Sequence, residues 1–219
     1  MLQKKEMIDV SDLVRNPTNV KNADPRTQHQ SLDHRLVFIG QFALSDRVPE
    51  DVRVHFETGK NLFVYAWFVY RFHMVAEQHI LATLEMALRL RVAACTATRP
   101  PRGLSKLLRV ACANKLIAND RLTSRHQWAL ERAQWRHDLA EMERMNREEA
   151  SECVVDYADV RPQEEDLNYD WLEHFICALP HVRNMHAHGS DALYPTVIST
   201  FGIVLELINQ LFEEQKREE

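Results

Sequence analysis

Residues 62–92 read LFVYAWFVYRFHMVAEQHILATLEMALRLRV. Nearly every side is apolar between Leu62 and Phe72, and this part is expected in a core or in a dimer interface. Apolar residues then recur at the spacing of one helix face, at Leu81, Leu84, Leu88 and Val92. Working outward, Pro49-Glu50-Asp51 is typical of a first helical turn, and Arg99-Pro100-Pro101-Arg102-Gly103 of a helix end. The pattern predicts helix from about residue 49 to about residue 97, weakened at Gly59.

The rest of the chain gives further helical patterns. They cover about 104–116, 123–149 and 169–187, the last with a kink or restart expected at Pro180, and a final helix that begins between 190 and 195. Five glycines and eight prolines in 219 residues suit long helices better than a sandwich or barrel with many hairpins. We predict an all-α protein, a bundle of four to five main helices.

One helix carries an apolar stripe at heptad spacing. Trp128, Trp135 and Met142 recur every seven residues, with Leu139 between them. This pattern predicts a buried seam of a helix pair.

The N-terminal part has a different character. Residues 1–48 are mostly polar, with Pro17 and Pro25, and are expected to form a loosely structured, partly irregular extension before a helical domain at 49–219. Within the extension, 36–39 is a short apolar segment that suits either a strand or a buried extended segment.

Composition and charge indicate which partners and which cellular location the protein can have. The chain carries −5 overall, but residues 89–147 hold thirteen Lys or Arg against five acids. Such a basic segment can attract a polyanion locally. The excess of basic residues is explained equally well by solvated helix faces whose arginines pair with nearby acids. The polar start and the short apolar runs favour a cytoplasmic protein without a membrane span. Cys95, Cys112 and Cys177 are expected to be reduced and buried.

The segment that suggests chemistry is Arg183-Asn184-Met185-His186-Ala187-His188, between the last two predicted helices. His188 follows Asn184 by one helical turn, so the two can share a face, and the long Arg183 side chain can reach them. A permanent cation, an amide and an imidazole that titrates near neutrality suit RNA cleavage by the RNA's own 2′-hydroxyl. No metal or other cofactor is required.

This motif, an arginine, a polar residue, three further residues and a histidine between the last two helices of a bundle, resembles that of the HEPN superfamily. Glu77 or Glu85 among apolar positions of an earlier long helix adds to the resemblance, which spans about residues 51–213. The resemblance implies a metal-independent endoribonuclease with Arg183 and His188 as catalytic residues, supported by Asn184. It also implies a homodimer with a composite site, and a toxin or phage-defence (abortive-infection) effector with a possible antitoxin partner.

Other interpretations stay open at this stage. We expect His186, Arg99 and Arg102 to contact the RNA substrate, and no metal site, since no HExxH pair is present. A catalytically inactive HEPN-like module that binds RNA, a nucleotide or a partner protein is the alternative. Arg183 and His188 could also be a structural pair that caps a helix.

Overall fold

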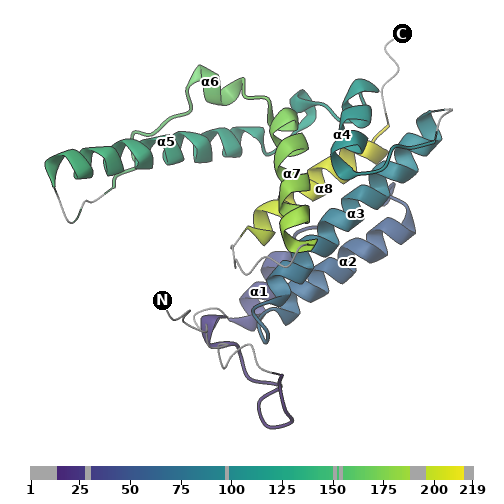
Figure 1. Ribbon diagram of the computed structural model, residues 1–219, viewed down its shortest axis with the longest axis horizontal. Helices are drawn as coiled ribbons and strands as arrows, with labels where there is room; N and C mark the ends of the chain where they lie inside the picture. Colours follow the sequence, from purple (N-terminus) through teal and green to yellow (C-terminus); the bar gives the residue numbers. More distant parts are fainter. Residues whose placement is uncertain are drawn as a thin grey trace, which may run out of the picture. The chain divides into compact units, whose positions relative to one another are not determined.

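The structure is a computed structural model that describes residues 14–27, 31–96, 99–149, 152, 155–187 and 196–214. These residues form helices and connecting segments, without a strand (Figure 1). The α-helices are α1 (Leu32–Gly40), α2 (Glu50–Tyr65), α3 (Phe72–Cys95), α4 (Leu104–Ala113), α5 (Arg125–Glu148), α6 (Glu164–Leu167), α7 (Trp171–Ala187) and α8 (Val197–Phe212). The all-α class predicted from the sequence is confirmed.

The chain divides into two compact units. The first comprises the described residues up to Ile117 and from Ile176 onward, and the second comprises Ala118–Phe175. The last part of α7, which carries Arg183 to Ala187 of the motif, therefore belongs to the first unit. The boundary between residues 48 and 49 stays a prediction.

The core of the first unit lies where α3 packs against α2 and α8 (Figure 1). Phe56 and Phe201 are fully buried and meet edge to face, with ring centroids 5.7 Å apart. Gly59 allows the close approach of α2 and α3, since a Cβ there would lie 2.8 Å from Cδ1 of Ile80. The side chains of Ile80, His79 and Phe201 thus occupy the space beside Gly59.

The single helix predicted over 49–97 is wrong, because residues 66–71 form turns between α2 and α3. These turns are held by the N-terminal segment. The Trp67 carbonyl accepts from the Asp24 N–H at 2.9 Å and from Thr27 Oγ1 at 2.8 Å, while Arg15 Nη2 donates to the Phe68 carbonyl at 2.6 Å. Backbone groups that a continuous helix would have paired internally find their partners far away in the sequence.

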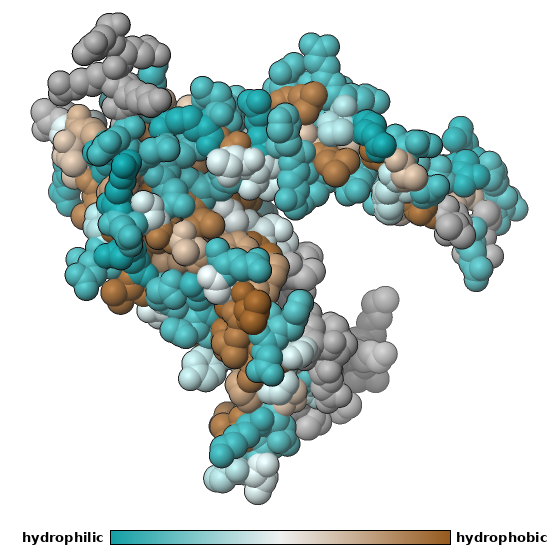
Figure 2. Space-filling model, turned by 180° about the vertical axis from the view of Figure 1, so that it is seen from behind, coloured by the Kyte–Doolittle hydropathy of each residue, from teal (hydrophilic) through white to brown (hydrophobic). Residues whose placement is uncertain are grey.

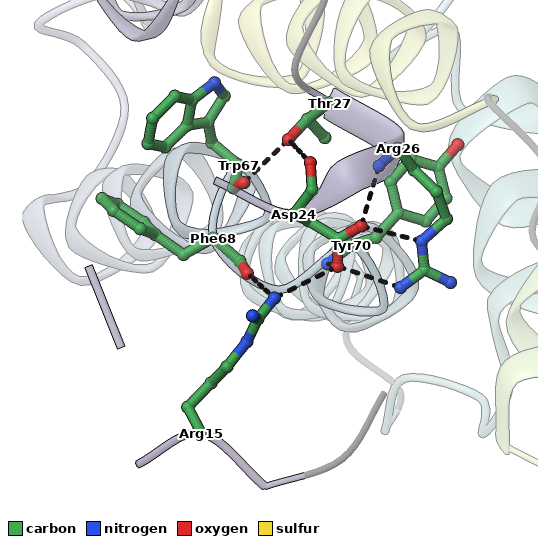
Figure 3. Close-up of polar contacts among 7 residues, drawn as sticks. All are labelled: Arg15, Asp24, Arg26, Thr27, Trp67, Phe68 and Tyr70. Carbon is green, nitrogen blue, oxygen red and sulfur yellow. Dashed lines mark hydrogen bonds and ion pairs between the residues drawn. The ribbon is translucent and has the colours of Figure 1, made fainter. Parts of the chain in front are cut away.

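Asp24 is the centre of this contact (Figure 3). Its fully buried carboxylate accepts from Arg26 Nε at 2.8 Å, Arg26 Nη2 at 2.9 Å and the Tyr70 N–H at 3.2 Å. Burial alone would raise the pKa of Asp24, but the hydrogen bonds from Arg26 and Tyr70 outweigh burial and lower it below its usual value. The described part of the predicted extension is therefore anchored, not loose.

Residues 36–39 belong to helix α1, so neither a strand nor an extended segment forms there. Arg35 attaches this helix to the core: Nε donates to the Phe63 carbonyl at 3.0 Å, and Nη2 contacts Nε2 of His73. Its guanidinium carbon also lies 3.8 Å from the centre of the Phe63 ring. Burial lowers the pKa of Arg35 to about 10, and burial together with the Arg35 charge lowers the pKa of His73 to about 4.

In the later helices of the first unit, the apolar residues that recur at the spacing of one helix face are buried. Leu107, Leu108 and Ala111 are fully buried in α4, and Phe201, Val204, Ile208 and Leu211 are fully buried in α8. Helix α7 continues through Pro180.

The second unit joins α5 to the segment that includes α6. Asp166 is fully buried and accepts from Arg136 Nη1 and Nη2, both at 2.7 Å, and from Arg132 Nε at 3.1 Å. Hydrogen bonds from Arg136 lower the pKa of Asp166 to about 2. Trp128 packs against Trp171 and Phe175, with ring centroids 5.4 and 5.3 Å away.

The predicted seam along α5 is wrong beyond Trp128. Trp135 is 63% exposed, Met142 59% and Leu139 38%. Figure 2 agrees that, over α5, hydrophobic residues lie at the surface among hydrophilic ones. The heptad spacing identified an apolar face correctly but did not show whether another helix of the chain covers it.

The cysteine prediction is also corrected in part. Cys95, Cys112 and Cys177 form no disulfide, but Cys95 and Cys177 are exposed and Cys112 is only half-buried. Cys153 lies outside the described residues.

Candidate functional site

Arg183 lies in the last turns of α7 and faces α3. Its Nη2 atom is 3.2 Å from Oε2 of Glu85, and the other oxygen of Glu85 pairs with Arg89 one turn further along α3. The Glu85 side chain is 8% exposed, whereas those of Arg183 and Arg89 are 40% and 53% exposed. A nearly buried carboxylate thus holds two guanidinium groups at the surface.

A second carboxylate, Glu77, lies two turns earlier on α3 and is fully buried. His186 Nε2 lies 2.8 Å from its Oε2 atom, and Thr200 Oγ1 donates to Oε1 at 2.6 Å. Thr196 Oγ1 donates to both oxygens, at 3.0 and 3.2 Å. Glu77 of α3 therefore links His186, near the end of α7, to Thr196 and Thr200, at the start of α8.

The structure describes two of the three predicted catalytic residues. Arg183 is half-exposed and ion-paired with Glu85, and Asn184 is exposed on α7. His188 lies outside the described residues. The approach of His188 to Arg183 therefore stays a prediction.

The three predicted substrate-binding residues fall in different places. The side chain of His186 is 4% exposed and contacts Glu77, so its position suits holding the end of α7 in place better than contacting a substrate. Arg99 and Arg102 are exposed in the connection between α3 and α4.

The structure adds Arg89, Thr196 and Thr200 to what the sequence indicated. The spacing of Glu85 and Arg89, four residues apart with the acid first, is that of a favourable pair on a helix and could have indicated Arg89. No local signal marks Thr196 or Thr200, because their partner Glu77 comes more than a hundred residues earlier in the chain.

Chemically, the arrangement offers positive charge in fixed positions. An arginine held by a carboxylate loses less side-chain freedom when it binds a second anion, so it is prepared to bind phosphate oxygens. Within the described ranges, no group of three or more His, Cys, Asp or Glu is placed to hold a metal ion. No helix among the described residues is long and apolar enough to cross a membrane.

Comparison with known proteins assigns the chain to no family. No family model matches the chain, and neither a curated protein nor a solved structure does. The likeness to the HEPN superfamily thus depends on the motif at 183–188, on its place near the end of α7 and before α8, and on the two carboxylates of α3.

Proposed function

We propose that this protein is a metal-independent endoribonuclease of the HEPN type, with Arg183 and His188 as catalytic residues. The observation that carries the proposal is the Arg183 guanidinium, half-exposed at the surface and held by the nearly buried Glu85. It stands five residues before an imidazole that can take or give a proton near neutral pH.

In the proposed reaction the 2′-oxygen of a ribose attacks the adjacent phosphorus, and the bond from phosphorus to the 5′-oxygen breaks. His188 takes the proton of the 2′-hydroxyl or gives one to the departing 5′-oxygen. Arg183 stabilises the negative charge that grows on the phosphate, and the exposed amide of Asn184 can hydrogen-bond to the same group. The products are a 2′,3′-cyclic phosphate and a 5′-hydroxyl.

One histidine cannot be base and acid at the same moment. A homodimer that brings two copies of the motif together would supply two imidazoles, one for each proton transfer. An enzyme of this kind can act as a toxin or as an abortive-infection effector in phage defence, restrained by a partner protein. Expression in a bacterium should then arrest growth, and His188→Ala should relieve the arrest.

The direct test is incubation of purified protein with RNA in EDTA. The proposal predicts cleavage with cyclic-phosphate ends, no cleavage of DNA or of RNA methylated at the 2′-oxygens, and loss of activity in Arg183→Ala and His188→Ala. His181→Ala is the matched control, because His181 is an exposed histidine of the same helix outside the proposed machinery. Full activity in both motif variants would refute the proposal.

A second candidate is an RNA- or nucleotide-binding module without catalysis. It is favoured by the shared pairing of Arg183 and Arg89 with Glu85, since two guanidinium groups at one place can bind an anion without any proton transfer. Tight RNA binding without cleavage of any RNA, with His188→Ala binding as the wild type does, would support this candidate.

A further inference from the structure

A surface hollow of about 440 Å³ lies beside the Arg183–Glu85 pair. Its lining combines three charged side chains with an apolar wall: Ala82, Glu85, Met86, Arg89, Leu90 and Arg183. All six belong to the first compact unit. Neither Arg89 nor the apolar wall is part of the RNMHAH motif.

The charges of this hollow do not cancel. Glu85 contributes one negative charge, and Arg89 and Arg183 contribute two positive charges that arginine does not lose at any physiological pH. Each guanidinium has five N–H donors, and among the described residues Glu85 is the one ion-pair partner of both. The carboxylate is nearly buried while the two cations reach solvent, so the spare donors are available from outside.

These features fit one phosphate of an RNA strand. Its two non-bridging oxygens can each accept from one guanidinium, and charge-assisted bonds of this kind are about twice as strong as neutral ones. Leu90, which is 44% exposed, and its neighbour Met86 provide apolar surface on which an adjoining base or ribose can lie. Single-stranded RNA is the form whose bases are free to make such contacts.

We infer that Arg89 and Arg183 together bind one phosphodiester of single-stranded RNA, so that Arg89 is a further substrate-binding residue. The inference rests on the proposed function for the identity of the anion. The competing interpretation is that Arg89 is only the partner of Glu85 in an i,i+4 pair. That interpretation predicts no effect of Arg89 on RNA binding.

The test uses a short single-stranded RNA with 2′-O-methyl riboses, which cannot be cleaved by the proposed reaction. Binding is measured by fluorescence anisotropy over a series of salt concentrations for the wild type, Arg89→Gln, Arg89→Lys and Arg183→Gln. Lys106→Gln is the matched control, because Lys106 is an exposed cation of α4 that does not line the hollow. Circular dichroism and thermal unfolding verify that each variant is folded.

We expect Arg89→Gln and Arg183→Gln each to weaken binding by roughly tenfold, the size of effect typical of a charge-assisted contact. The slope of log K against log salt should fall by up to about 0.7 in each, the value for one phosphate contact of a single strand. Arg89→Lys should lie between Arg89→Gln and the wild type, since a lysine keeps the charge but not the planar fork. Lys106→Gln should bind within about twofold of the wild type, because an isolated exposed charge contributes little.

Unchanged affinity and salt slope in Arg89→Gln would overturn the inference. If the wild type nevertheless cleaves unmodified RNA in EDTA, the ribonuclease proposal stands without the Arg89 contact. If the binding effects appear but no RNA is cleaved, the phosphate site stands and the ribonuclease proposal fails. A wild type that does not bind RNA would refute both.

Discussion

The contact between Arg35 and His73 makes the stability of the fold depend on pH. His73 is buried, and Arg35 lies against its Nε2 atom, so a proton on the ring would place a second positive charge there. The folded-state pKa of His73 is lowered to about 4, from about 6.5 for an exposed histidine. The unfolded chain therefore binds the proton first as the pH falls.

The magnitude follows from the difference between the two pKa values. The contribution of His73 to stability is fully present above about pH 6.5 and is lost as the pH falls to about 4. A shift of about 2.5 pKa units at about 1.4 kcal/mol per unit gives a full loss of about 3.5 kcal/mol. About 3 kcal/mol of it is lost by pH 4, where half of the folded molecules carry the proton. That is a large fraction of the stability of an ordinary domain, which is roughly 5–15 kcal/mol.

The assay is urea denaturation between pH 7.5 and pH 4, for the wild type and for His73→Gln. The amide oxygen of glutamine can still accept from Arg35, but the side chain does not titrate. Between these pH values the wild type should lose about 3 kcal/mol more than the variant, and all other titrating groups are common to both. His34→Gln, at an exposed position of α1, should follow the wild type. Parallel curves for the wild type and His73→Gln would refute this reasoning.

Three further outcomes follow from the buried carboxylates. Asp24→Asn should lower the free energy of unfolding, measured by chemical denaturation, by roughly 3 kcal/mol, because it removes the charge that Arg26 faces. The control Asp46→Asn, at an exposed position, should change the free energy of unfolding by less than about 0.5 kcal/mol. Glu77→Ala should lower the free energy of unfolding by about 3 kcal/mol, because His186 and Thr200 lose their shared partner. The same variant should cleave less RNA, and equal activity per folded molecule would contradict this expectation. Asp166→Ala should release α6 from α5, and limited proteolysis should then cut between residues 156 and 167 faster than in Glu165→Ala; equal rates would contradict that.

The positions of most helices could be predicted from apolar periodicity. The break between α2 and α3 could not. Residues 66–71 contain neither proline nor glycine, and their turns are stabilised by Asp24, Thr27 and Arg15, about forty to fifty residues earlier. A local pattern carries no information about such partners.

The α5 stripe shows a related limit. A period of seven residues states that one side of the helix is apolar, and it does not state what lies against that side. Trp128 finds Trp171 and Phe175, whereas Trp135 and Met142 stay exposed.

For the candidate site, the sequence indicated Arg183 and one of two acids, Glu77 or Glu85, but not that both take part nor which motif residue each one contacts. The structure pairs Arg183 with Glu85 and His186 with Glu77. His186 and His188 are two residues apart and could not be told apart by residue type. The structure separates them by burial, because the His186 side chain is 4% exposed and contacts Glu77, which leaves it little surface for a substrate.

The central claim is that Arg183 and His188 cut RNA without a metal. It is tested most directly by incubating RNA in EDTA with the wild type, Arg183→Ala, His188→Ala and the control His181→Ala, and by analysing the ends of the products. We predict 2′,3′-cyclic phosphate ends from the wild type and from His181→Ala, and intact RNA from the two motif variants. Intact RNA with the wild type, or equal cleavage by all four proteins, would contradict the claim.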